Sequence, residues 1–150
     1  MHGLQVTDVE RIPTHGGSFR VYARKRQTGL QERAESATAR LRTMLEMAAQ
    51  AGAQVYGVGA ATRATPLIHY AGIAPFITCV CEVSSSAKIG HLMPGTSISV
   101  VDEVRLIEDQ PEYALLFSWH IAADLMPKLR AMGYRGKFII PLPEPRVTDG

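Results

Sequence analysis

The pattern of apolar residues changes sharply between Ala53 and Ile73. Val55, Tyr56 and Val58 form a short apolar run that is typical of a buried strand. Gly57 and Gly59 allow the backbone to turn without a Cβ clash. From Ala60 onward, residues that suit a buried helix face recur at steps of three and four: Ala61, Ala64, Leu67, Ile68 and Ala71. The pattern predicts a strand, a glycine turn and a helix that begins immediately after the glycines.

The chain after this helix continues to alternate between strand and helix patterns. We expect strands at 76–83, 98–101, 113–119 and 136–142, a long loop at 84–95, and helical turns at 102–109 and 120–132 despite Pro127. A proline-rich tail follows the last strand. The order of these elements predicts an α/β fold, Rossmann-like, with a mostly parallel open sheet and flanking helices.

The N-terminal third has a different organisation. Residues 3–24 predict two strands joined by the polar turn Pro13 to Ser18, and residues 29–50 predict a long helix whose apolar stripe includes Leu41 and Leu45. We therefore divide the chain into a β-hairpin at 1–26, a connecting helix at 27–52 and a Rossmann-like domain at 53–150.

Composition narrows the function classes. With 150 residues, 46% of them hydrophobic, the chain is long enough for one complete core. The net charge of +2 is small. The basic run Arg24-Lys25-Arg26 also has few aromatic residues nearby, so we expect no nucleic-acid partner. No apolar run reaches the about 18 residues needed to span a bilayer, and no signal peptide is evident, so we expect a cytoplasmic protein without a membrane partner.

Cys79 and Cys81 are the only cysteines. We expect their side chains on opposite faces of a strand, which disfavours a disulfide or a shared metal. No other grouping of His, Cys, Asp and Glu has the spacing of metal ligands, so we expect no metal site.

The glycine turn is a candidate anion site. A strand, a glycine turn and a helix N-terminus direct backbone N–H groups to one place. Arg63 in the first helical turn adds a positive charge, and Thr62 and Thr65 add hydroxyl donors. Glu82 ends the next strand 23 positions after Gly59, where dinucleotide folds hold a ribose. A tight turn without a ligand and an ordinary carboxylate at a strand end remain the alternatives.

Several motifs recur in one family: His15-Gly16-Gly17-Ser18, the segment Gly57 to Ile73, Lys88 to Thr96, Ser118-Trp119-His120, and Gly136 to Pro141. Over residues 3–147 the chain resembles the C-terminal part of the S-adenosylmethionine (SAM)-dependent sugar-nucleotide C-methyltransferases, which methylate a carbon of a keto-deoxysugar carried by a nucleoside diphosphate. The resemblance implies that residues 3–24 end the SAM-binding domain and that residues 53–147 form a Rossmann-like C-terminal domain. The enzymes resembled also have a zinc-binding N-terminal domain, and this domain and the SAM site would then precede Met1. We therefore expect this chain to bind no cofactor and to methylate nothing alone.

The resemblance also implies roles for individual residues. His15 is the expected base that removes a proton next to the sugar carbonyl, with Gly16, Gly17 and Ser18 beside the substrate. A turn histidine that caps backbone groups is the alternative. The expected contacts to a nucleoside-diphosphate sugar are Gly57, Gly59, Arg63, Thr65, Glu82, Lys88, Trp119 and His120. The family favours a carboxylate where Thr14 stands, Lys for Arg63, Asp for Glu82 and Pro-Trp-Asn for Ser118-Trp119-His120; Arg63 and Glu82 keep the charge.

Two further questions stay open at this stage. The alternative function is a stand-alone, non-catalytic Rossmann-like module that holds a nucleotide, NAD or CoA. The exposed apolar residues of the hairpin predict either disorder or a homodimer formed through the hairpin, and we favour the dimer.

Overall fold

The computed structural model describes residues 4–13, 16–25 and 29–150 of the chain. It divides into two compact units, residues 1–34 and residues 35–150. The predicted fold class is confirmed: an N-terminal antiparallel hairpin and a long helix precede a mostly parallel α/β sheet.

The first unit is built around a two-stranded ribbon. Strands β1 (Leu4–Ile12) and β2 (Ser18–Lys25) pair antiparallel, with an irregularity between Val6 and Asp8. Directly paired residues share a face. The register therefore gathers the apolar side chains on one face, among them Val6, Val9, Phe19, Val21 and Ala23, whereas Asp8, Glu10, Arg20 and Tyr22 lie on the other. Glu10 accepts hydrogen bonds from Tyr22 (3.0 Å) and Arg20 (3.4 Å), so the polar face carries its own network.

The second unit contains a six-stranded sheet in the order β5-β4-β3-β6-β7-β8. Strands β3 to β7 of this sheet are parallel to one another, and β8 is antiparallel to β7. Their bounds are β3 Val55–Val58, β4 Cys79–Glu82, β5 Ser99–Asp102, β6 Tyr113–Leu116, β7 Lys137–Ile140 and β8 Arg146–Thr148. This order is that of a doubly wound fold, in which β3 and β6 flank the point where the direction of winding reverses.

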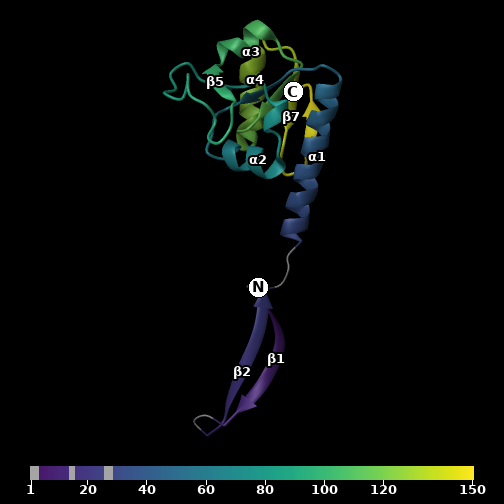
Figure 1. The fold of residues 1–150 in the computed structure, drawn as a ribbon, viewed down its shortest axis with the longest axis vertical. Helices are drawn as coiled ribbons and strands as arrows, with labels where there is room; N and C mark the ends of the chain where they lie inside the picture. Colours follow the sequence, from purple (N-terminus) through teal and green to yellow (C-terminus); the bar gives the residue numbers. More distant parts are fainter. Residues whose placement is uncertain (1–3, 14–15, 26–28) are drawn as a thin grey trace. The chain divides into compact units, whose positions relative to one another are not determined.

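Helices cover both faces of this sheet (Figure 1). Helix α1 (Leu30–Gln50) and helix α2 (Ala64–Ala71) pack on one face, where Leu41, Leu45 and Ile68 meet inward side chains of the strands such as Val80 and Leu115. Helices α3 (Val104–Asp109) and α4 (Ala122–Ala131) cover the opposite face. Because successive strand residues point to opposite faces, the continuous apolar runs of β3 and β6 supply both cores.

The structure shortens several predicted elements. Helix α2 begins at Ala64, not directly after the glycines, and Arg63 precedes it as the N-cap residue instead of lying in its first turn. The predicted strand 76–83 is limited to β4, because Ala74–Phe76 forms a 3₁₀ turn (η2). The run 113–119 ends as a strand at Leu116, and Trp119–Ile121 forms a second 3₁₀ turn (η3).

The prediction that the sheet ends at 136–142 is wrong. The tail returns as β8, an antiparallel edge strand. Its end is held by Arg130, whose guanidinium donates hydrogen bonds to the carbonyl oxygens of Asp149, Tyr134 (2.7 Å) and Gly136 (2.8 Å) and lies 4.4 Å from the Phe138 ring centre. The contact with Asp149 joins residues that are 19 positions apart, so the local sequence pattern of β8 does not reveal it.

The expectation that the two cysteine side chains lie on opposite faces of the strand is also wrong. Residues two apart in a strand point to the same face, and Cys79 and Cys81 both lie in the core beneath α3 and α4. Both thiols are free and buried. The hydrogen bond with Cys79, together with burial, raises the pKa of the Cys81 thiol, so Cys81 is held protonated.

Candidate functional site at the carboxyl edge of the sheet

The predicted binding residues of the second unit gather where the parallel strands end. Gly59 follows β3, Glu82 ends β4, and Ser118, Trp119 and His120 follow β6. Ligands of doubly wound folds bind outside these carboxyl ends, near the reversal of strand order. The topology therefore places these residues at one edge, although they are far apart in the sequence.

Gly57 serves packing within the sheet. A Cβ atom at this position would lie 2.5 Å from Cε2 of Phe117 and 3.0 Å from Cγ2 of Val80. Gly57 is buried and pairs with both neighbouring strands, so its missing side chain makes room for the Phe117 ring. Gly59, in contrast, has a φ of +88°, which few other residues adopt, and turns the backbone out of the sheet.

The turn is fastened to the next strand by backbone and side-chain contacts. The Gly59 amide donates to the carbonyl of Cys81 (2.8 Å), and the Ala60 amide donates to Oε2 of Glu82 (2.8 Å). The second carboxylate oxygen of Glu82 accepts a hydrogen bond from the Val83 amide (3.1 Å). Nζ of Lys88 donates to the carbonyl of Ala60 (2.7 Å) and lies 3.8 Å from Oε2 of Glu82. Both polar groups of Ala60 are therefore held by charged side chains.

Two cavities flank this turn. The first, here called the loop cavity, has a volume of about 720 Å³ and lies between the start of α2 and the long connection that follows β4; its polar lining residues are Thr62, Thr65, Lys88 and His91. The second, here called the switch-point crevice, has a volume of about 320 Å³ and lies between Gly59, the end of β4 and α4. Glu82, Glu103, Asp124 and Lys128 are its charged lining residues.

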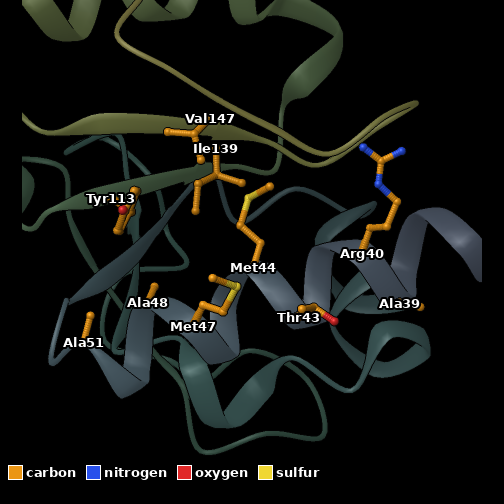
Figure 2. A pocket seen from close by; sticks show the side chains of 10 residues that line it. All are labelled: Ala39, Arg40, Thr43, Met44, Met47, Ala48, Ala51, Tyr113, Ile139 and Val147. Atoms are coloured by element: carbon orange, nitrogen blue, oxygen red, sulfur yellow. The ribbon is translucent and has the colours of Figure 1, made fainter.

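A third hollow lies on the α1 side of the sheet, with a volume of about 600 Å³. Figure 2 shows Met44 pointing from α1 toward Ile139, with Val147 beyond it and Arg40 at the opposite end. The lining is mainly apolar and brings together no acid, base and nucleophile among the described residues. We therefore place the candidate site at the two cavities beside the glycine turn.

The remaining predicted residues are distributed around these cavities. Thr65 and Lys88 line the loop cavity, and Gly59 and Glu82 line the crevice. Arg63 is exposed and belongs to neither lining set. Trp119 is half-buried and packs against both cores, while His120 beside it is exposed.

The predicted catalytic base, His15, lies outside the described residues, as does Thr14. Its neighbours are described: Gly16 and Gly17 have φ values of +82° and +123°, and Ser18 begins β2. Both glycines therefore adopt backbone conformations that favour glycine.

Sequence reasoning did not assign His91 to a binding site, yet it lines the loop cavity together with Thr62. The available signal was the length of the connection between β4 and β5, since long loops in compact domains are frequently functional. His69 helps to hold that connection, because its Nε2 lies 2.9 Å from the carbonyl oxygen of Pro94.

Other titratable groups lie in the core or away from this edge. The Tyr56 hydroxyl donates to Asp109 (2.7 Å), and burial together with this carboxylate raises the pKa of Tyr56 to about 12. No cluster of three potential metal ligands occurs in the part of the chain that the structure describes. Within the same residues, no helix combines the length and apolar character needed to cross a membrane.

Comparison with known proteins identifies the family. The sequence model of the protein family described as "C-methyltransferase C-terminal domain" matches residues 26–143. The chain is also 28% identical, over 176 residues, to the C-methyltransferase NovU from Streptomyces niveus, and this match covers 99% of the chain and 42% of that protein. The chain thus spans about two fifths of this relative. Because the family model matches most of its length, the chain belongs to the C-methyltransferase C-terminal domain family.

Proposed function

We propose that this chain is the C-terminal part of a SAM-dependent C-methyltransferase that acts on a nucleotide-linked keto-deoxysugar, and that it binds the nucleotide sugar. Family membership supports the methyltransferase assignment. The observation that carries the binding role is the loop cavity, which combines an ammonium group, an imidazole and two hydroxyls beside a turn at the carboxyl edge of the sheet. Small-molecule sites have volumes of about 300–1,000 Å³ with a few polar groups in an apolar lining, and the cavity agrees with this description.

We further propose that His15 is the base. Methylation at carbon needs a carbon nucleophile, and removal of the proton next to a sugar carbonyl leaves an enolate. A histidine suits this transfer near neutral pH. The positive φ angles of Gly16 and Gly17 support the role, because a backbone without side chains can approach a sugar closely.

We also infer that SAM binds outside this chain, and the contacts of Glu82 support this inference. In Rossmann-like sites, the carboxylate at the end of the second strand binds ribose hydroxyls. The corresponding Glu82 already accepts hydrogen bonds from two backbone amides, and its side chain is only 15% exposed. We therefore assign the methyl donor to residues outside this chain and expect no methylation by the chain alone.

Isothermal titration calorimetry with thymidine diphosphate, NADH, CoA and SAM tests the binding role. We expect thymidine diphosphate to bind and SAM to give no signal. Binding of NADH or CoA without any nucleoside diphosphate would contradict the proposal and would indicate a stand-alone cofactor-binding module. A methyltransferase assay with a nucleotide-linked keto-sugar tests the expected lack of activity.

We also propose that the hairpin pairs with a second copy of the chain. Its apolar face exposes Val6, Val9, Val21 and Phe19, the last at 71%. Among the described residues, neither strand of the ribbon has a second neighbouring strand, so the outer edge of each is open to pairing with another chain. Covering this face would remove several large side chains from water, which favours association.

A further inference from the structure

The two cavities beside the glycine turn carry opposite charge. The switch-point crevice is lined by three carboxylates, and its single cation, Lys128, lies 3.4 Å from Oε2 of Glu103. The loop cavity contains Lys88 and His91, and none of its described lining residues is acidic. A diphosphate carries at least two negative charges at neutral pH. Carboxylates repel such a group, so the charge of the lining favours the loop cavity.

Lys88 is positioned by the turn and still available to a ligand. Its ammonium group has three N–H donors; one bonds the Ala60 carbonyl at 2.7 Å, and a second has Glu82 as a neighbour at 3.8 Å. The side chain is 56% exposed, and it lines the loop cavity. The third donor can therefore bond a phosphate oxygen without loss of the contact to Ala60.

Glu82 performs a different task from the one that its position at a strand end predicts. Its oxygens accept the amides of Ala60 and Val83, and its charge lies next to Lys88. These contacts fix the turn and the ammonium group at the same time. With these contacts made, the Glu82 carboxylate influences ligand binding indirectly, by holding Lys88 and the Ala60 peptide in place.

We propose that the loop cavity binds the diphosphate group of the nucleotide sugar through Lys88, with His91, Thr62 and Thr65 as further donors. Glu82 is a positioning residue for Lys88 and the turn, and it is not a ribose contact. This inference rests on the proposed function, and it adds His91 to the site.

The first test compares two lysines by calorimetry with thymidine diphosphate. Lys88→Met removes the lysine of the loop cavity, and Lys137→Met, at an exposed residue that begins β7 and lines neither cavity, is the matched control. Loss of a charge-assisted hydrogen bond should weaken binding about 10- to 100-fold in Lys88→Met. Lys137→Met should leave the affinity unchanged. The inference is overturned if Lys137→Met weakens binding as much as Lys88→Met, or if Lys88→Met has no effect. If the wild-type chain binds no nucleoside diphosphate, the proposed function itself fails.

The second test separates positioning from ribose binding by Glu82→Gln. Inorganic pyrophosphate has no ribose, so we compare its Kd with that of thymidine diphosphate. A positioning role predicts that the substitution changes both Kd values by the same factor and accelerates amide exchange at Ala60. A ribose contact predicts a loss for thymidine diphosphate alone, and that result, or a failure of pyrophosphate to bind the wild-type chain, overturns the inference.

Discussion

Gly57→Ala tests whether this glycine is required by packing or by a ligand. The added methyl group would lie 2.5 Å and 3.1 Å from two carbons of the Phe117 ring and 3.0 Å from Cγ2 of Val80. Phe117 is fully buried, and its ring is rigid, so the contact cannot be relieved by turning a flexible side chain into solvent. We expect the folded state to be destabilised without any ligand present.

The magnitude follows from two opposing effects. An extra methyl group in a well-packed core costs about 1–3 kcal/mol. Replacing glycine by alanine also restricts the unfolded chain, which contributes about 0.4–1 kcal/mol in the opposite direction. The net decrease in the free energy of unfolding should be about 1–2 kcal/mol, which lowers the urea midpoint by about 0.5–1 M for an m-value near 2 kcal/mol/M.

Urea denaturation followed by circular dichroism measures this change. Gly29→Ala is the matched control, because the nearest atom to its Cβ is an exposed carboxylate oxygen at 3.6 Å; its midpoint should stay within about 0.3 M of wild type. Phe117→Leu provides a second test, since a smaller side chain makes room for the methyl group. The cost of Gly57→Ala should be smaller in that background. An unchanged midpoint in Gly57→Ala, or strict additivity in the double variant, would refute the packing argument.

Three further predictions concern stability and assembly. Arg130→Ala should lower the free energy of unfolding by about 1–3 kcal/mol, because three backbone carbonyls and the Phe138 ring lose a charged partner. In thermal melts, Arg130→Lys should unfold at a temperature between those of the wild type and Arg130→Ala. An unchanged melting temperature in Arg130→Ala would contradict the stabilising role of Arg130. The pKa of Tyr56 is raised to about 12, so the contribution of its protonated hydroxyl to the free energy of unfolding is complete below pH 10 and is lost as the pH rises toward 12. Between pH 9 and pH 11, urea titrations should show a larger decrease in the free energy of unfolding for the wild type than for Tyr56→Phe. Equal decreases would show that the Tyr56 hydroxyl does not contribute. Size-exclusion chromatography with light scattering should give a dimer for the intact chain and a monomer for Phe19→Ser or for a version that begins at Gly29; a monomeric intact chain would rule out the hairpin dimer.

Local pattern determined the type and order of most elements. The apolar runs at β3 and β6 and the three- to four-residue steps of α2 arise from the side-chain periodicities of strand and helix, which act within a few residues. For that reason the long helix, the hairpin and the mostly parallel sheet were predictable. The motifs from Gly57 to Ile73 and Gly136 to Pro141 also pointed to the family that the comparison confirmed.

Contacts between distant segments decided the remaining features. The Phe117 ring makes Gly57 a packing glycine, and Arg130 holds the tail through the carbonyl oxygen of Asp149. The Ala60 peptide bonds the charged groups of both Glu82 and Lys88. The residues of each pair are far apart in the sequence, so the local spacing of apolar residues does not predict these contacts. The sequence alone determined which backbone elements form, because propensity and apolar spacing are local. Only the tertiary structure decided which charges meet at the carboxyl edge, because the order of strands in the sheet, and not the order of residues in the chain, sets the distances between side chains.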